Sequence, residues 1–326
     1  MSDDEDKIPA FPVVRLGRVQ AESERNDWLI EHLWSEAAVG CIGGTPKSGK
    51  TWLALEMALA VASGTPCLGR YRVPRSGTVL IYAAEDRPHA LRRRAEELCR
   101  ARGLDLEKLA VGLITEPALR LDVPGHQLRL STTIQELKPK LLVLDPLVRL
   151  HRSDENSSAD ISELLGYLRS LQRAYGVAIA LVHHVRKSGA GQPGQSLRGS
   201  GDLHAWGDSN LYLLRRKGGL VLQAEHRSQP SPDAVGVELS TNPVRLTVTG
   251  DGPALGDLEQ AVVDALQNGP VARSALRSQL RVRNERLGDA LQRLQAAGRV
   301  ICHESGWAVP VPVSKDQPER NERQPR

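Results

Sequence analysis

The sequence has few of the features that mark secreted, zinc-binding or membrane proteins. Its four cysteines (Cys41, Cys67, Cys99 and Cys302) are scattered and form no C-x-x-C pair, which argues against a disulfide framework or a cysteine-ligated zinc site. No apolar run is long enough to span a membrane, and the acidic start of the chain is the opposite of a signal peptide. We therefore expect a cytoplasmic protein with reduced thiols and no membrane partner.

Aromatic residues and net charge are also low. Aromatic residues make up 3% of the chain, so few rings are available to stack on nucleic-acid bases. The formal net charge is only +4, which is too small for the whole molecule to bind nucleic acid by charge alone. Any contact with DNA must come from local patches. The 326 residues suffice for one α/β domain and a small second domain.

The most informative segment is Gly44–Thr51, which fits the phosphate-binding pattern G-x-x-x-x-G-K-[ST] without a mismatch. Its glycines let the backbone curl so that successive N–H groups point at one anion. We expect Lys50 to reach the β- and γ-phosphates of ATP, and Thr51 to give a hydroxyl ligand to Mg²⁺. The predicted nucleotide-binding residues are Gly44, Thr45, Pro46, Lys47, Ser48, Gly49, Lys50 and Thr51.

The flanking sequence argues against an accidental match in a glycine-rich turn. The apolar run 37–42 before the loop predicts a buried strand, and residues 52–62 after it predict a buried helix that ends at Gly64. A strand, a loop and a helix in this order are the context that a phosphate loop needs, because the helix N-terminus favours an anion.

Residues from about 37 to 216 alternate apolar strands with helical patterns, which predicts an α/β fold with a mostly parallel sheet flanked by helices. After Trp206, short strands separated by turn residues predict antiparallel hairpins at one sheet edge. Three helices and a hairpin beyond Gly256 resemble a winged helix. The expected organisation is an N-terminal arm over 1–27, an ATPase core over 28–250, a linker over 251–256, a winged-helix domain over 257–312 and a disordered tail over 313–326.

Two carboxylates follow predicted strands of the core. Asp145 ends the apolar strand 141–144 and is the candidate for the second Mg²⁺ ligand; the alternative is a cap on the next element. Pro146 follows Asp145, so no adjacent glutamate is present to polarise water. Glu85 follows the strand 78–83, and we expect it to orient and activate the attacking water. The alternative for Glu85 is that it only opens the next helix.

Two histidines end the predicted strand 177–183, next to the strand of Asp145. One of them is placed to sense the γ-phosphate, and strand alternation favours His183 over His184. The polar loop that follows contains Arg186, Lys187 and Arg198. These cations could contact a DNA backbone, or the loop could be a solvated connection.

These motifs resemble those of RecA-fold ATPases, and most closely the RepA-like and DnaB-like hexameric helicases. The resemblance covers roughly residues 28–246. Separate placement of the glutamate (Glu85) and the metal-binding aspartate (Asp145) distinguishes this class from the AAA+ group, in which the two are adjacent. The markers are Gly-Gly-Thr-Pro-Lys-Ser-Gly-Lys-Thr from Gly43, Ala-Ala-Glu-Asp from Ala83, Leu-Leu-Val-Leu-Asp-Pro from Leu141, Leu-Val-His-His from Leu181 and Leu-Arg-Gly-Ser-Gly from Leu197.

The resemblance also implies a basic finger that reaches the γ-phosphate of a neighbouring subunit. Ala224–Ser228 looks like the family's Ala-Lys-x-Arg-x pattern, which makes Arg227 the finger, although Glu225 stands where the family has lysine. The family further implies an arginine in the helix after Glu85, for which Arg92, Arg93 and Arg94 all qualify. A finger that acts on a neighbour requires self-association, and the family implies a homohexameric ring.

The C-terminal module offers a second DNA-binding candidate. Arginines cluster near the start of its third helix, where a recognition helix would contact a DNA groove. The alternative is a module that docks a protein partner and has an ordinary charged surface. The outward arginines are Arg273, Arg277, Arg281, Arg283, Arg286 and Arg293, of which Arg281, Arg283 and Arg286 are the predicted DNA contacts.

The sequence therefore predicts an ATPase that uses ATP and Mg²⁺ and acts on DNA. Its family implies a replicative helicase or translocase with single-stranded DNA in the ring, and duplex DNA is a candidate for the winged helix. The alternative is an ATP-dependent switch that assembles on DNA or a partner without unwinding. A small-molecule kinase is a more distant reading, because Glu85, Asp145 and His183 favour water as the acceptor.

Overall fold

The computed structural model describes most of the chain. The described residues are 11–18, 28–152, 158–184, 201–216, 219–249, 255–267, 269–280, 282, 284–303 and 306–310.

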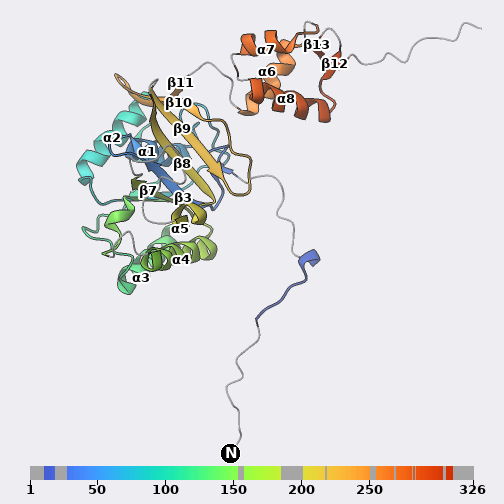
Figure 1. Cartoon of the computed structure of the whole chain (residues 1–326). Coiled ribbons are helices and arrows are strands. Elements are labelled where there is room, and N and C mark those ends of the chain that lie inside the picture. The colour runs from blue at the N-terminus through green and yellow to red at the C-terminus, as the bar shows by residue number, and fades with distance from the viewer. Residues whose placement is uncertain are drawn as a thin grey trace, which may run out of the picture.

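A nine-stranded sheet forms the centre of the larger part of the molecule (Figure 1). Its strand order is β11-β10-β9-β8-β3-β7-β6-β4-β5, and the neighbours from β8 to β5 are parallel. The strands from β8 to β11 pair as antiparallel hairpins. The predicted fold class, a mostly parallel sheet with antiparallel hairpins at one edge, is confirmed. The strands are β3 (Val39–Gly44), β4 (Val79–Ala83), β5 (Val111–Leu113), β6 (Leu141–Asp145), β7 (Ala178–His184), β8 (Ser209–Arg216), β9 (Gly219–His226), β10 (Val235–Thr241) and β11 (Val244–Thr249).

Helices cover both faces of this sheet because its central strands are apolar on both sides. Along β6, Val143 packs in a core with α1 and α2, whereas Leu142 and Leu144 pack in a second core with α3 and α4. This alternation follows from the two-residue period of a strand. The helices of this part are α1 (Lys50–Ser63), α2 (Pro88–Ala101), α3 (Pro124–Leu137), α4 (Ser158–Tyr175) and α5 (Gly201–Trp206), with short 3-10 turns η2 (Leu106–Lys108) and η3 (Leu147–Arg149).

Several elements were not predicted from the sequence. The hairpin of β1 (Trp28–Ile30) and β2 (Trp34–Ser35) packs its buried residues into the α1 core. Helix α3 was missed because only Leu130 and Ile134 are buried along its length, so its apolar pattern is weak. Helix α5 lies where the sequence favoured a polar loop.

The C-terminal part has a core of its own, made from residues such as Leu258, Leu276 and Leu291. Its elements are α6 (Leu255–Ala265), α7 (Arg273–Leu280), α8 (Asn284–Ala296) and the antiparallel pair β12 (Ile301–His303) and β13 (Gly306–Ala308). These are the three helices and the hairpin that the sequence suggested. Their assignment as a winged-helix domain, like the other domain boundaries, stays a prediction.

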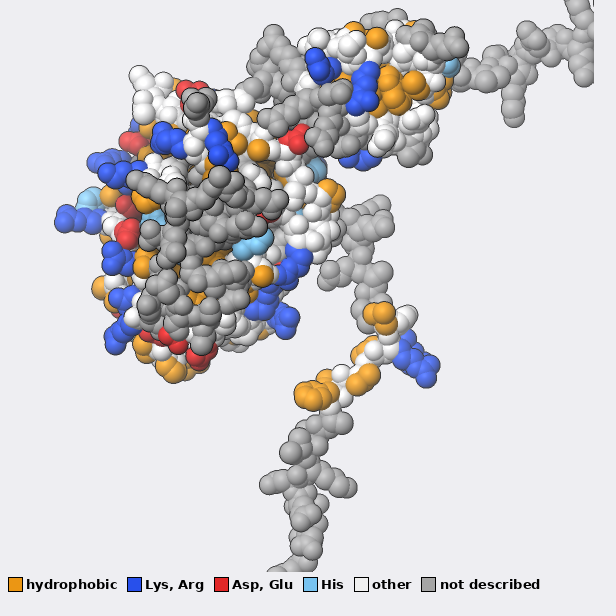
Figure 2. Space-filling model, in the orientation of Figure 1, with side chains coloured by type: hydrophobic (Ala, Val, Ile, Leu, Met, Phe, Trp, Pro, Cys, Tyr) orange, Lys and Arg blue, Asp and Glu red, His pale blue; other side chains and the backbone are white. Residues whose placement is uncertain are grey.

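An arm, residues Phe11–Arg18, precedes the core and ends in the short turn η1 (Leu16–Arg18). Hydrophobic side chains are exposed along it (Figure 2). In the part of the chain that the structure describes, no helix has both the length and the apolar character needed to cross a membrane.

Candidate nucleotide site

The phosphate loop connects β3 to α1 at the carboxyl end of the parallel strands. Gly44 lies so close to its neighbours that an added Cβ would stand 2.6 Å from the Ser48 hydroxyl and 2.7 Å from the Leu213 carbonyl oxygen. Gly49 has φ 95°, a left-handed conformation that favours glycine. The two motif glycines are therefore required for different reasons, one by close packing and the other by backbone geometry.

Lys50 is folded back onto the loop. Its ammonium group donates hydrogen bonds of 3.0 Å to the carbonyl oxygens of Gly44 and Thr45. Burial lowers the pKa of Lys50, and the nearby carboxylates of Asp145 and Glu85 oppose that shift. The cation is thus held at the phosphate loop, with the carboxylates of Asp145 and Glu85 nearby.

The Thr51 hydroxyl and Asp145 meet at the same point. Thr51 Oγ1 donates a hydrogen bond of 2.7 Å to Asp145 Oδ2. Burial raises the pKa of Asp145 to about 6, and the charges of Asp86 and Glu85 add to this, against the hydrogen bond from Thr51. A carboxylate that is buried beside two other acids is stabilised by a cation. This supports the predicted pairing of Thr51 and Asp145 as Mg²⁺ ligands.

Glu85 lies just beyond β4, which pairs with β6 so that Ala83 is opposite Asp145. Both carboxylates therefore reach the same edge of the sheet, as the sequence predicted. Glu85 is exposed, and Arg149 Nε donates a 3.0 Å hydrogen bond to its Oε1. Its position lets it act on a water above the phosphate loop, and its role as the base stays a prediction.

These residues line one cavity of about 1080 Å³. The cavity has the size and the mixture of polar and apolar walls expected of a nucleotide site. Among the described residues, the buried Ser48 hydroxyl has no hydrogen-bond partner, so the loop retains a polar group for a ligand. Among the described residues of the lining, Thr51 and Asp145 are in direct contact and would hold Mg²⁺, with phosphate oxygens and water completing its shell.

Comparisons with known proteins agree with this geometry. Residues 4–190 match the AAA_25 family, which is described as an AAA domain. The chain belongs to the AAA_25 family. The DNA repair protein RadA of Escherichia coli (strain K12) is 28% identical over 153 residues, which are 46% of this chain and only 28% of RadA.

The solved structure of an ATPase domain shows the same fold as this AAA_25 chain. The ATPase domain of G40P has a TM-score of 0.51 at 15% identity, over 66% of this chain and 86% of that domain. A KaiC-like protein from Pyrococcus horikoshii OT3 has a TM-score of 0.47 at 19% identity, over 68% of this chain and 94% of that one. The chain is a RecA-like P-loop ATPase by fold and by family.

In this AAA_25 chain, His184 lines the nucleotide cavity, whereas His183 is 3% exposed and packs beside Gly43 of β3. The sequence preferred His183 because strand alternation continued to it. The geometry favours His184 as the group nearer to the nucleotide, and the sensing role itself remains a prediction.

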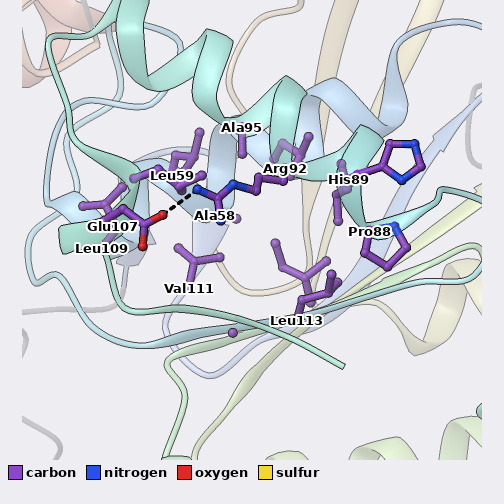
Figure 3. A pocket seen from close by; sticks show the side chains of 15 residues that line it. Ala58, Leu59, Pro88, His89, Arg92, Ala95, Glu107, Leu109, Val111 and Leu113 are labelled. Carbon is purple, nitrogen blue, oxygen red and sulfur yellow. Dashed lines mark hydrogen bonds and ion pairs between the residues drawn. The ribbon is translucent and has the colours of Figure 1, made fainter. Parts of the chain in front are cut away.

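The three arginines of α2 have different surroundings. Arg94 lines the nucleotide cavity, donates a 2.6 Å hydrogen bond to Asp86 and lies over the Trp52 ring at 5.7 Å. Arg92 instead binds Glu96 and Glu107 beside a second, apolar pocket (Figure 3). Arg94 is therefore the one of the three that a nucleotide could contact.

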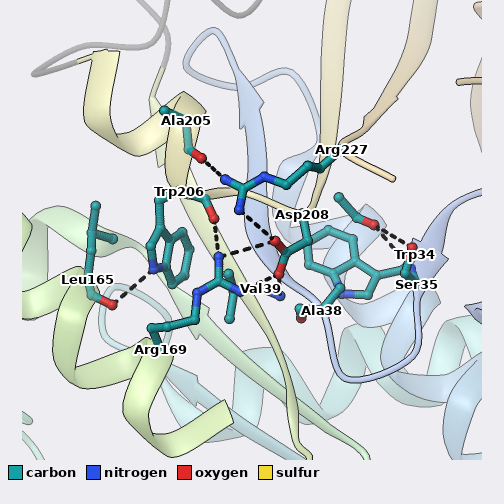
Figure 4. A network of polar contacts seen from close by, with 11 residues as sticks. Trp34, Ser35, Ala38, Val39, Leu165, Arg169, Ala205, Trp206, Asp208 and Arg227 are labelled. Atoms are coloured by element: carbon teal, nitrogen blue, oxygen red, sulfur yellow. Dashed lines mark hydrogen bonds and ion pairs between the residues drawn. The ribbon is translucent and has the colours of Figure 1, made fainter. Parts of the chain in front are cut away.

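Arg227 lies at the opposite end of the sheet from its own phosphate loop. It follows β9, whose last residue pairs with Ser209 at the start of β8, whereas Gly44 pairs with Leu213 farther along β8. Its guanidinium binds the Ala205 carbonyl oxygen and Asp208, the latter at 3.4 Å (Figure 4). Asp208 also accepts hydrogen bonds from Arg169, so Arg227 is held in a network of its own subunit.

Glu225, the residue that departs from the family's lysine, is also held within its own subunit. Its carboxylate lies 2.9 Å from His204 Nε2 and accepts a 3.1 Å hydrogen bond from Gln223. Glu225 therefore contacts residues of its own subunit, and Arg227 is the arginine of this segment that remains as the finger candidate.

The structure does not describe most of the predicted DNA contacts. Arg286 lies in α8, but its side chain is not described. Arg186, Lys187, Arg198, Arg281 and Arg283 lie outside the described residues.

The sequence missed the outer wall of the nucleotide cavity. Trp52, Arg215 and Arg216 line it together with hairpin residues such as Gly219 and Gly236. The sequence signal that could have pointed to this wall is the pair Arg215 and Arg216 after a predicted strand. Their relation to the loop depends on the pairing of β8 with β3, which the local sequence does not specify.

Proposed function

We propose that this chain is a motor ATPase that assembles head to tail into a ring, hydrolyses MgATP between subunits and moves on single-stranded DNA, as a replicative helicase or translocase does. The observation that carries the proposal is the position of Arg227. Because it lies at the far end of the sheet from the phosphate loop, it can complete a nucleotide site only in a second copy of the chain.

The residues at the site have complementary tasks in this proposal. The phosphate-loop N–H groups and Lys50 bind the phosphates, while Thr51 and Asp145 hold Mg²⁺. When bound there, Mg²⁺ would supply positive charge against the charge that develops on the phosphate oxygens. Glu85 orients a water for attack on the γ-phosphate and accepts its proton.

The neighbouring subunit supplies Arg227, which must leave Asp208 to stabilise charge on the transferring phosphoryl group. His184, the last residue of β7, lines the same cavity and is proposed to contact the γ-phosphate. Arg186, Lys187 and Arg198 come soon after it in the chain, so a shift at His184 can reach the proposed DNA-binding loop.

DNA as the partner has two supports. RadA, part of which resembles this chain, is named a DNA repair protein. The motifs themselves resemble those of hexameric helicases. Duplex DNA is the proposed partner of the C-terminal module, through Arg281, Arg283 and Arg286.

A regulator that binds DNA or a protein through this module, and uses ATP only to control assembly, is the second candidate. The separate apolar core of α6–α8 favours it, because that module can act without translocation.

Steady-state ATP hydrolysis with and without single-stranded DNA separates the two candidates, with Lys50→Ala as the inactive control. A motor is expected to hydrolyse ATP faster on single-stranded DNA, and the increase should disappear in Arg227→Ala. A slow rate of ATP hydrolysis that single-stranded DNA does not raise, together with site-specific binding to duplex DNA, would reject the motor and support the regulator.

A further inference from the structure

Glu85, the proposed base, lines two cavities at the same edge of the sheet. One is the nucleotide cavity, whose lining also contains Lys50 and Asp145. The other is the side cavity, a mostly polar hollow of about 310 Å³. Since the same carboxylate belongs to both linings and is about half exposed, it can turn from one cavity to the other. Besides Glu85, the side cavity is lined by Tyr82, Ala84, Pro117, Ala118, Arg120 and Arg149.

An ion pair with Arg149 holds the Glu85 carboxylate at the side cavity. Arg149 Nε donates a 3.0 Å hydrogen bond to Glu85 Oε1. A carboxylate oxygen that already accepts a hydrogen bond from a guanidinium is less able to take a proton from water. The two side chains are 58% and 48% exposed, and an exposed ion pair is weak enough for a competing anion to break. The pair is therefore suited to restrain the base reversibly.

The backbone around Arg149 is well anchored, so an exchange of partners involves its side chain. Arg149 ends the turn η3, which follows Asp145 at the end of β6. Its amide donates a 3.1 Å hydrogen bond to the Pro146 carbonyl oxygen, and its neighbours Leu147 and Leu150 are buried. The arginine that holds the proposed base thus comes from the same short segment as the proposed Mg²⁺ ligand.

Arg120 brings a second cation to the side cavity. Its guanidinium binds the carbonyl oxygens of Arg149 and His151, and within the described part of the chain it binds no carboxylate. Glu116, which precedes this wall of the cavity, is already paired with Arg129 at 2.8 Å. The lining therefore carries two guanidinium groups against one carboxylate. Guanidinium groups match the geometry of phosphate oxygens, so the excess charge suits a phosphate group.

We propose that the Arg149–Glu85 pair restrains the base, and that a phosphate group bound by Arg149 and Arg120 breaks this pair. Glu85 then turns to the nucleotide cavity and accepts the proton of the attacking water. The occupant that we infer is a backbone phosphate of single-stranded DNA, because Pro117 and Ala118 are exposed and leave access for a strand. This inference rests on the DNA motor of the proposed function, and Arg149 acts in it as a positioning residue.

Arg149→Met tests the restraint in the absence of DNA. We expect kcat for ATP hydrolysis to rise roughly two- to fivefold, as suits the loss of a weak pair, while KM for ATP stays unchanged. Arg149→Lys keeps a cation beside Glu85 and should stay close to wild type. Arg173→Met, an exposed change on α4, is the matched control. An unchanged or lower kcat in Arg149→Met would overturn the restraint.

A double variant shows whether the effect passes through the base. The gain from Arg149→Met should disappear when Glu85→Gln is added, because no carboxylate is then released. Thermal melts of each variant identify any general loosening of the fold. A gain that persists in the Glu85→Gln background would overturn the proposal, because Arg149 would then act on hydrolysis by another route.

Binding of a fluorescent oligothymidylate, measured by anisotropy with a non-hydrolysable ATP analogue, tests the phosphate site itself. Arg120→Met and Arg149→Met should each weaken binding several-fold and lower its dependence on salt by about one phosphate contact. Arg173→Met should leave the affinity unchanged. Unchanged affinity in the Arg120 and Arg149 variants would reject DNA as the occupant. Inorganic phosphate that raises wild-type hydrolysis as much as DNA does, at equal ionic strength, would also reject it.

Failure of the motor and failure of the restraint give different results. A wild-type rate that single-stranded DNA does not raise rejects the motor, and with it DNA as the occupant of the side cavity. The restraint is judged separately, by the rate of Arg149→Met without any strand. DNA-stimulated hydrolysis in wild type, together with an unchanged rate in Arg149→Met without DNA, would reject the restraint and leave the motor standing.

Discussion

The Thr51 hydroxyl donates a hydrogen bond to Asp145 although 94 positions separate the two residues in the chain. Their contact joins the start of α1 to the end of β6, at the edge where parallel strands deliver their carboxyl ends. One threonine and one buried carboxylate thus form the proposed place of the cation.

Asp145→Asn preserves the size of the side chain and an acceptor for Thr51, but removes the charge. We expect hydrolysis to fall by at least about 100-fold, because the Mg²⁺ ligand is lost. The variant should still fold, since a buried carboxylate with a raised pKa costs stability at neutral pH. ATPase assays and thermal melts check both statements. Wild-type hydrolysis in the variant would remove Asp145 from the metal site.

Glu85→Gln tests the base. Removal of a positioned general base is expected to lower kcat by about 10²- to 10⁴-fold while nucleotide affinity changes little. Rapid-quench assays and nucleotide titrations separate the two quantities. Glu163→Gln, an exposed change on α4, is the matched control. An equal fall in affinity and rate would instead assign Glu85 to binding.

Arg227→Ala should abolish most hydrolysis, by about 10³-fold or more, if the finger acts on a neighbour. Mixing this variant with Lys50→Ala creates interfaces that contain one intact phosphate loop and one intact finger. In an equal mixture about a quarter of the interfaces are of this kind, so activity should reappear. A mixture as inactive as its two components would show that Arg227 does not act between subunits.

Glu56 and Arg102 form a pair inside the core that has no part in the proposed chemistry. Their charged groups are 3.2 Å apart, and Glu56 also accepts a 2.7 Å hydrogen bond from the Leu68 amide. Burial raises the pKa of Glu56, and Arg102 opposes this. Arg102→Met should lower the free energy of unfolding by about 3–5 kcal/mol at pH 8, because it removes the cation that pairs directly with the buried carboxylate.

The sign of the pH effect on Arg102→Met follows from that raised pKa. Below the pKa of Glu56 in the unfolded chain, the carboxyl group is protonated in both the folded and the unfolded state. The stability lost through Arg102→Met should then be small. The stability lost through the substitution grows as pH rises. It reaches its full value above the pKa that Glu56 has in the folded variant. Denaturant titrations between pH 4 and 8 check this, with exposed Arg100→Met as the control. A loss of stability that does not change with pH would mean that Arg102 acts through packing of its side chain alone.

Much of the fold could be predicted because its signals are local. The strand before the phosphate loop, the loop and the helix after it are contiguous, and apolar runs such as 141–144 are long enough to indicate buried strands. Helix α3 and the β1–β2 hairpin lacked such patterns, since few of their residues reveal a period. Burial of these elements depends on contacts that only the folded chain makes.

By itself, the sequence determined the chemistry of the site: a glycine-rich loop with Lys50 and Thr51, and carboxylates that follow apolar strands. These depend on residue type and short spacing. The tertiary structure alone decided that His184 rather than His183 lines the cavity, that Arg94 is the arginine of α2 that lines it, and that Arg227 lies at the far end of the sheet. Strand order and pairing are made by contacts between distant segments, and no local pattern encodes which end of a neighbouring strand a side chain reaches.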